Sequence, residues 1–304
     1  MATIFVAIAA FNERYLQQTV DSLLRNKSGK HEIIVSICDF RSDDEFPEFV
    51  LPEIIHYRHK SSIPTGVGVA RSMALRNCEM FDYVLQVDAH MIFGSEWDSN
   101  LVDRHMELTK LEGVLAISQH VPACQDLGDG KLTEDTNPNH LQTPVRLFVN
   151  DQCKIWSEPW AKTESEWYKE NTAVHAAFMF TTSEVLVTIP PDPLIFFFGE
   201  EHTTYMRMIS RGIKSFSTDY CDITHLDKNQ KFYDDMEKRD WRTFTYANYV
   251  AEINSFELFS NKRALSILSG KITGLWGAPD ENSANEAIHI MNLNLKQFES
   301  IVKF

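Results

Sequence analysis

Features of secreted and membrane proteins are scarce in this sequence. It has five cysteines, and no two of them have the CxxC spacing, so we expect neither a disulfide framework nor a thiolate zinc site. No apolar run is long enough to span a bilayer, and no basic segment with an apolar stretch follows Met1. The sequence therefore predicts a cytoplasmic protein with no signal peptide and no contact with a membrane.

Positive charge is also in short supply. The chain has 29 Lys and Arg residues against 43 Asp and Glu residues, for a formal net charge of −14. An acidic chain disfavours non-specific binding to nucleic acid or to anionic membranes. An anionic substrate would need a metal ion or local cations, and the clearest clusters of cations are residues 58–60 and 228–242.

Two common nucleotide-binding motifs, GxGxxG and the P-loop lysine, are missing. The nearest segment is residues 66–71 (GVGVAR), which precedes a predicted helix and does not follow the first strand. A Rossmann dinucleotide site is therefore not expected. We interpret Gly66 as part of a tight turn that lets the next helix place Arg71 near a phosphate or a ribose. The alternative is a glycine turn followed by an exposed arginine.

The order of predicted elements indicates an α/β fold. Hydrophobic residues make up 43% of the chain, which is enough for a full core. In the first ninety residues, short apolar runs alternate with segments of helical periodicity, and this predicts a doubly wound, mostly parallel sheet that binds ligands at the carboxyl ends of its strands. The expected strands are residues 3–9, 32–38, 54–57 and 83–87, and the expected helices are residues 16–24 and 67–77.

The later part of the chain continues this pattern and then changes character. Near residue 228 it becomes mainly helical, with an interruption at residues 272–279. We therefore expect two units, residues 1–227 and a helical extension at residues 228–304. Between residue 100 and that boundary we expect a helix at 101–111, strands at 113–118 and 173–181, a polar loop at 122–141 and a helix at 205–211.

The strongest chemical signal is Asp88 and His90, which follow the strand at residues 83–87. A carboxylate and an imidazole two residues apart can bind one divalent cation if the chain bends there, and oxygen and nitrogen ligands suit Mn²⁺ or a similar ion. His225 follows a later strand and would add the third ligand of a mononuclear site. On spacing alone, a strand-end carboxylate with incidental histidines remains the alternative.

Two further groups of residues are candidates for binding a substrate. Glu200 and Glu201 come after an aromatic run at a helix start, where acids are favoured in any case, and one of them could instead hydrogen-bond sugar hydroxyls. Polar or turn residues that follow the first two strands lie where a nucleotide base and ribose would bind, although they could equally be ordinary loop residues. These residues are Ala10, Phe11, Asn12 and Asp39.

In their order and spacing, these residues resemble the GT-A glycosyltransferases. The resemblance is closest to the cytoplasmic polypeptide α-N-acetylglucosaminyltransferases that act on hydroxyproline, a family similar to the mucin-initiating polypeptide N-acetylgalactosaminyltransferases. It spans roughly residues 3–226. The matching stretches are residues 66–72, residues 83–93 with Trp97 and Asp98, residues 197–201, and Gly212 followed by Thr224 and His225.

The resemblance implies a role for each of the candidate residues. It implies a GT-A (Rossmann-like) sheet with flanking helices, in which Asp88, His90 and His225 bind Mn²⁺ or Mg²⁺. A UDP-sugar would be the donor, and Glu200 or Glu201 would lie beside the transferred sugar with Arg71 near the diphosphate. Related enzymes retain the configuration of the sugar. The implied nucleotide contacts are Ala10, Phe11, Asn12, Asp39, Gly66, Arg71, Gln86 and Asp88.

The sequence also departs from the family pattern. Many relatives have a Ser/Thr-rich, acidic turn where this chain has residues 9–12, and neither the loop at 122–141 nor the helical tail has a counterpart that we can place. We expect those two segments to select the acceptor, which the resemblance implies is a protein hydroxyl. A phage transferase that acts on hydroxymethylated DNA bases in the host cytoplasm, a sugar nucleotidyltransferase and a non-catalytic nucleotide-sugar-binding module are the alternatives.

Overall fold

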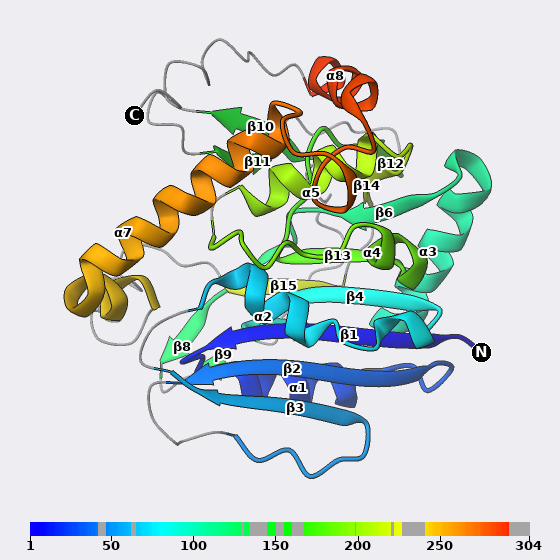
Figure 1. Ribbon diagram of the computed structural model, residues 1–304. Coiled ribbons are helices and arrows are strands. Elements are labelled where there is room, and N and C mark those ends of the chain that lie inside the picture. Colours follow the sequence, from blue (N-terminus) through cyan, green and yellow to red (C-terminus); the bar gives the residue numbers. More distant parts are fainter. Residues whose placement is uncertain are drawn as a thin grey trace.

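In the computed structural model, the described part of the protein folds around one large sheet (Figure 1). The structure describes residues 1–41, 47–61, 65–128, 131–133, 145–149, 155–159, 167–197, 199–219, 222–226 and 241–291. The helices of this part are α1 (Leu16–Arg25), α2 (Val67–Ala74), α3 (Trp97–Glu112), α4 (Ser183–Thr188), α5 (Glu200–Ile209), α7 (Trp241–Leu268) and α8 (Glu281–Ile290).

The large sheet has eight strands in the order β12-β14-β6-β13-β4-β1-β2-β3. Strands β4, β1, β2 and β3 run parallel to one another, as the alternation of strands and helices predicted. Strand β13 is antiparallel to both β4 and β6, and β12 is antiparallel to β14. The strands are β1 (Thr3–Phe11), β2 (Glu32–Arg41), β3 (Ile54–Lys60), β4 (Tyr83–Asp88), β6 (Leu115–Ser118), β12 (Tyr168–Glu170), β13 (Phe178–Thr182) and β14 (Lys214–Thr218).

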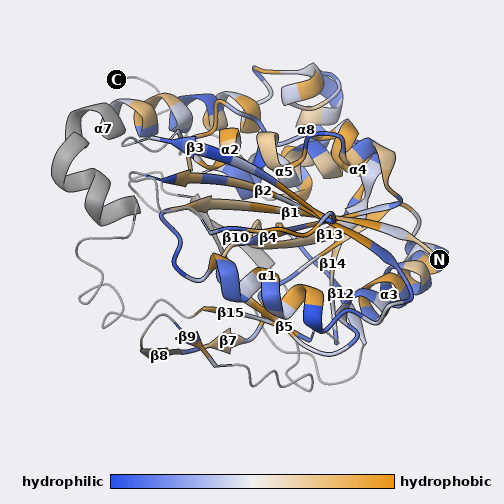
Figure 2. Ribbon diagram, turned by 90° about the horizontal axis from the view of Figure 1, so that it is seen from below, coloured by the Kyte–Doolittle hydropathy of each residue, from blue (hydrophilic) through white to orange (hydrophobic). Residues whose placement is uncertain are grey.

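Helices cover both faces of this sheet. Figure 2 shows α1 and α3 on one face and α2, α4, α5, α7 and α8 on the other. Each face has its own hydrophobic core, since strand side chains alternate between the two faces. The predicted mostly parallel α/β architecture is therefore confirmed.

A second, three-stranded sheet lies on the α1 side and has the order β5-β15-β7. Its strands are β5 (Met91–Phe93), β15 (Ile223–Leu226) and β7 (Ala123–Cys124). The chain passes from β4 into β5 through Ala89 and His90, so this small sheet begins directly where the large one ends. The antiparallel pairing of β15 with β5 places His225 opposite Met91.

The described part of the loop at 122–141 forms short strands instead of an irregular loop. They are β7 together with the hairpin strands β8 (Asp126–Gly128) and β9 (Lys131–Leu132). A further hairpin joins β10 (Val145–Val149) to β11 (Ile155–Pro159). Residues 129–130 and 134–141 of the predicted loop lie outside the described residues, as does most of the cationic segment at 228–242.

The C-terminal helices α7 and α8 pack on the body of the chain, as Figure 1 shows. Arg263 on α7 forms an ion pair with Asp192, whose Oδ2 lies 2.7 Å from the guanidinium Nε. Ala264 on the same helix touches Gly199, where a Cβ would lie 2.6 Å from the alanine methyl. The predicted helical tail and its interruption are thus confirmed for residues 241–291. Among the described residues, no helix has the length and apolar character needed to cross a membrane.

Candidate metal centre and active site

The carboxyl ends of the central strands bring several of the predicted site residues to one edge of the sheet. Strand β1 lies between β2 and β4, with Ala9 paired to Asp88 on one side and Ala10 paired to Asp39 on the other. Asp39 and Asp88 therefore lie at nearly the same level, with β1 between them. This edge of the sheet therefore has two halves, one around Asp39 and one around Asp88.

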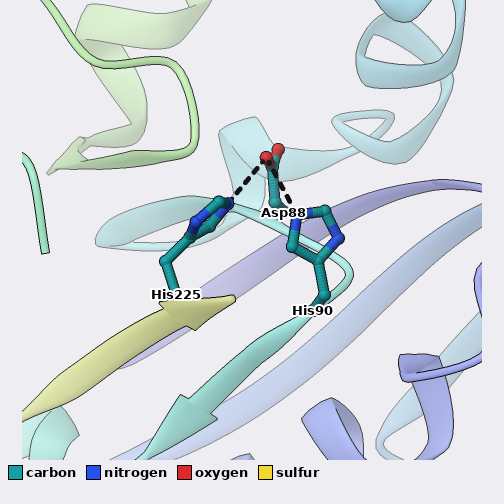
Figure 3. Close-up of side chains that lie close together, drawn as sticks. All are labelled: Asp88, His90 and His225. Atoms are coloured by element: carbon teal, nitrogen blue, oxygen red, sulfur yellow. Dashed lines mark hydrogen bonds and ion pairs between the residues drawn. The ribbon is translucent and has the colours of Figure 1, made fainter. Parts of the chain in front are cut away.

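Asp88, His90 and His225 form a compact cluster of potential ligand atoms (Figure 3). One ligand atom from each residue lies within 4.8 Å of the other two. The Asp88 Oδ2 atom is 3.4 Å from Nε2 of His225 and 3.7 Å from Nε2 of His90. Residues far apart in the sequence converge here because β15 pairs with β5, and the main-chain N–H of Leu226 donates to the His90 carbonyl at 3.1 Å.

The donor set of this cluster fits a divalent cation of the first transition row. One carboxylate oxygen and two imidazole nitrogens are the ligand types that Mn²⁺ and related ions accept. The side chains of Asp88 and His225 are 28% and 25% exposed, so the cluster is open on one side, while His90 is only 8% exposed. The cluster can therefore hold an ion that also contacts a substrate.

The carboxyl group of Asp88 is held in its charged form. Burial alone would raise its pKa, but a hydrogen bond with His225 and the nearby charges of Arg71 and His90 hold the pKa well below its ordinary value. An ionised carboxylate is the form that binds a cation. The environment of Asp88 is therefore suited to a metal ligand across the physiological pH range.

Arg71 connects this cluster to Glu200. Its guanidinium places one nitrogen 3.0 Å from Oδ1 of Asp88 and bonds Oε1 of Glu200 with the other. The guanidinium makes these contacts away from solvent, because Arg71 as a whole is only 5% exposed. Burial raises the pKa of Glu200, and the charge of Arg71 offsets part of that rise. Arg71 thus fixes the position of two carboxylates, and its predicted contact with a phosphate stays a prediction.

Glycines at the start of α2 explain how Arg71 reaches this position. Gly66 has φ = 92°, in the left-handed region that favours glycine, and a Cβ there would lie 2.8 Å from the Phe196 ring. A Cβ on Gly68 would collide with the main-chain oxygens of Asp192 and Ile195. These glycines let α2 dock against the segment that leads to Glu200. Close packing therefore accounts for both glycines, and the predicted nucleotide contact of Gly66 stays a prediction.

Glu201 and Gln86 both bond the loop that precedes β13. The main-chain N–H of Ala176 donates to Oε1 of Glu201 at 2.8 Å, and Nε2 of Gln86 donates to the Ala176 carbonyl at 2.9 Å. Gln86 is 3% exposed. The two side chains fix this loop next to the Asp88 cluster, and the predicted contact of Gln86 with a nucleotide stays untested.

The other half of the edge contains the predicted nucleotide-binding residues. Asp39 is fully buried, and its Oδ2 lies 3.0 Å from Nε of Arg41 and 3.5 Å from Nε2 of His56. Its Oδ1 is buried without a hydrogen-bond partner among the described residues. Ala10 and Phe11 end β1 next to it and Asn12 follows the strand, and the predicted nucleotide contacts of these residues stay a prediction.

Sequence reasoning did not foresee several residues beside the cluster. His90 Nδ1 lies 2.9 Å from Oε2 of Glu13, a residue 77 positions away in the sequence. The rings of His120 and His175 are tilted by 40° with their centroids 4.1 Å apart, and the His175 ring centroid is 6.5 Å from that of His225. Burial, together with the neighbouring histidines, holds the pKa of both His120 and His175 well below the ordinary value. Lone histidines carry no sequence signal, but Glu13 follows the first strand, as Asn12 does.

The chain matches a known protein family over most of its length. A model of the glycosyltransferase (GlcNAc) family matches residues 47–295, well over half of the 304-residue chain. No curated protein sequence is significantly similar to the chain. The family match includes α7, α8 and the rest of the described C-terminal part.

A solved structure shares the fold at low sequence identity. The chain resembles GalNAc-T7, whose crystal structure contains UDP, GalNAc and Mn²⁺, with a TM-score of 0.55 and 14% identity. The match covers 92% of this chain and 59% of that one, so the chain spans little more than half of the length of GalNAc-T7. At this identity the likeness shows the fold alone. The family match shows that this chain belongs to the glycosyltransferase (GlcNAc) family, and the structural match shows a GT-A-like fold.

Proposed function

We propose that the enzyme is metal-dependent and retaining, and that it moves a sugar from a UDP-sugar to a hydroxyl group of a macromolecular acceptor. The observation that carries this proposal is the convergence of Asp88, His90 and His225 beside the Arg71–Glu200 pair. The UDP, GalNAc and Mn²⁺ in the GalNAc-T7 crystals support the same choice of donor type and ion. A protein hydroxyl is the acceptor that the resemblance to the hydroxyproline-directed transferases favours.

In this proposal, the two halves of the sheet edge bind two parts of the donor. Asp39 and the turn at Ala10, Phe11 and Asn12 hold the base and ribose, with Oδ1 of Asp39 as an acceptor for a base N–H. Asp88, His90 and His225 hold Mn²⁺ or Mg²⁺ next to the diphosphate. Bound there, the ion would neutralise negative charge on the leaving diphosphate. The buried Arg71 adds positive charge to the same region.

The transferred sugar would lie on the Glu200 side of the cluster. Glu200 is bound by Arg71, and Glu201 accepts the N–H of Ala176, so each has a fixed orientation. A carboxylate already bonded to arginine is a poor covalent nucleophile. We therefore favour attack of the acceptor hydroxyl from the face on which the diphosphate leaves, with a diphosphate oxygen taking the proton. Glu200 or Glu201 as a nucleophile is the weaker alternative.

Mass spectrometry of donor turnover tests the proposal. The purified protein is incubated with Mn²⁺ and a panel of nucleotide sugars, and the nucleotide released from each is measured with and without EDTA. We expect UDP release from one UDP-sugar, loss of release with EDTA, and loss in Asp88→Ala. A folded Asp88→Ala protein with full transfer activity would contradict the metal-dependent mechanism.

The same assay separates the alternatives for acceptor and reaction. The best donor is repeated with a peptide, a glycan and hydroxymethylated DNA, and each acceptor is weighed for an added sugar. Addition to the peptide supports a protein acceptor, and addition to the DNA supports the phage-type alternative. In a parallel incubation with a sugar phosphate and a nucleoside triphosphate, formation of a nucleotide sugar with release of pyrophosphate would indicate a nucleotidyltransferase. Donor binding with no turnover on any acceptor would indicate a binding module.

A further inference from the structure

Glu13 contacts the candidate metal centre without belonging to it. Its Oε2 lies 2.9 Å from Nδ1 of His90, and its Oε1 accepts the main-chain N–H of Tyr15 at 3.1 Å. The carbonyl oxygen of Glu13 accepts a guanidinium N–H of Arg41 at 3.0 Å. Both carboxylate oxygens and the main chain of Glu13 are therefore fixed.

The local backbone turns Glu13 toward β4. Asn12 has φ = 47°, in the left-handed region that asparagine adopts more readily than most residues. Its N–H donates to the Phe40 carbonyl at 2.9 Å, which ties the turn to the end of β2. A left-handed residue right after a strand reverses the chain direction. The turn thereby carries the carboxylate of Glu13 across the sheet edge to the imidazole of His90.

We propose that Glu13 is a positioning residue that sets the tautomer and the ring orientation of His90 for metal binding. An imidazole that donates from Nδ1 to a carboxylate has its proton on Nδ1 and its lone pair on Nε2. The Nε2 atom of His90 is the one that faces Asp88, at 3.7 Å. The inference rests on the proposed function, because it takes His90 as a ligand.

The surroundings of the pair favour this role over an incidental surface contact. The side chains of Glu13 and His90 are 15% and 8% exposed, so little water competes for Nδ1. A carboxylate also makes the imidazole more electron-rich, which strengthens its bond to a cation. A carboxylate, a histidine and a metal in this order are a recurring arrangement, and loss of the carboxylate typically weakens metal binding about 10–100-fold.

Two substitutions separate the hydrogen bond from the charge. Glu13→Gln keeps an oxygen that can accept from Nδ1 but removes the charge, whereas Glu13→Ala removes both. Glu107→Gln serves as the control, since Glu107 lies on α3 with a side chain 54% exposed. Mn²⁺ affinity is measured by electron paramagnetic resonance of the free ion, with no substrate present. The His90 tautomer is measured in metal-free protein by ¹⁵N NMR of its ring, assigned with a His90→Gln variant.

We expect metal-free wild-type protein to have the His90 proton on Nδ1. Glu13→Ala should shift the proton toward Nε2 and raise the Kd for Mn²⁺ by about 10–100-fold. Glu13→Gln should raise the Kd less, and Glu107→Gln should leave it unchanged. A thermal melt of each variant shows whether it is folded, so that a loss of affinity is not mistaken for a loss of structure.

The outcomes distinguish this inference from the proposed function. If wild-type protein binds Mn²⁺ and Asp88→Ala does not, while both Glu13 variants bind as wild type with an unchanged His90 tautomer, the role of Glu13 is overturned and the metal centre stands. If wild-type protein and Asp88→Ala show the same lack of Mn²⁺ binding, the proposed metal centre fails, and the inference about Glu13 fails with it.

Discussion

At the scale of single residues, Asp88 uses its two oxygens for different purposes. Oδ1 bonds Arg71, and Oδ2 faces the imidazoles of His90 and His225. The first contact anchors the carboxylate to the protein, and the second aims it at the space where an ion would bind. Because Arg71 also binds Glu200, one buried cation orders the acids on both sides of it.

The low pKa of Asp88 predicts a specific pH dependence of stability. In EDTA, to exclude any metal ion, wild-type protein should be more stable than Asp88→Asn at neutral pH, because the folded state favours the carboxylate. The pKa of Asp88 is lower in the folded state than the value of about 3.9 expected when unfolded, so the advantage is present above about pH 4 and shrinks as the pH falls further. Urea unfolding at a series of pH values measures the difference. An advantage that grows on acidification would contradict the prediction.

A second residue-scale prediction concerns Arg71. Arg71→Met leaves the buried Glu200 and the partly exposed Asp88 without their shared cation, which should lower the free energy of unfolding by about 3–5 kcal/mol. Arg71→Lys keeps a charge but cannot donate to both carboxylates in the same planar geometry, so we expect a smaller loss. Arg104→Lys, at a half-exposed ion pair, should change stability by less than about 1 kcal/mol. Urea denaturation compares the three, and Arg71→Met as stable as Arg104→Lys would refute this account.

The sequence allowed the cluster of Asp88, His90 and His225 to be predicted residue by residue, but not the residues around it. Asp88 and His225 could be predicted to lie together because each follows a predicted strand, and the carboxyl ends of parallel strands meet at one edge of the sheet. Glu13 was not assigned to His90 because its partner lies 77 residues away, and a hydrogen bond between two loops leaves no periodicity in the sequence. The close contact of Gly68 with Asp192 was not foreseen either, because it joins two segments far apart in the sequence.

At the scale of elements, the position of His225 depends on the pairing of β15 with β5. Ile223 pairs with Phe93 and Thr224 with Ile92, which fixes the register that brings His225 opposite Met91. Just beyond β5, the N–H of Gly94 donates to the Asp222 carbonyl at 2.6 Å. A single shift of register would turn His225 to the other face of the small sheet.

Gly94 therefore offers a test of this pairing. A Cβ at position 94 would collide with the carboxylate of Asp222, so Gly94→Ala should destabilise the protein by about 1–3 kcal/mol and weaken Mn²⁺ binding by displacing β15. In the double variant Gly94→Ala/Asp222→Ala the colliding atoms are gone, and part of the lost affinity should return. Thermal melts and Mn²⁺ titrations of wild-type protein, the two single variants and the double variant complete a double-mutant cycle. Additive losses in the double variant would show that the collision is not the cause.

Strand direction was the part of the fold that local sequence pattern could not supply. A strand was predicted at residues 173–181, and β13 is found at Phe178–Thr182. Its antiparallel insertion between β4 and β6 depends on long-range pairing that a short apolar run does not encode. The insertion matters for the site, because the loop that precedes β13 contains Ala176, to which Gln86 and Glu201 bond.

At the scale of the whole molecule, the proposed division at residue 227 separates two segments that are in close contact. Gly199, which directly precedes α5 and Glu200, packs closely against the methyl group of Ala264 on α7. Asp192, which packs against Gly68, is the partner of Arg263. We therefore propose that residues 241–291 form a covering layer of the catalytic unit, and that they do not unfold as an independent domain.

Differential scanning calorimetry tests this arrangement. We expect the full chain to unfold in one transition, because the contacts of α7 support the start of α5. Ala264→Leu should push α7 away from Gly199, lower the stability by about 1–3 kcal/mol and shift that single transition down by a few degrees. It should also reduce sugar transfer, since Glu200 is the first residue of α5. Leu258→Ala, on an exposed side of α7 where Leu258 is 56% exposed, is the matched control and should change neither property. Two separate transitions, of which Ala264→Leu shifts only one while transfer continues at the wild-type rate, would establish the extension as a domain of its own.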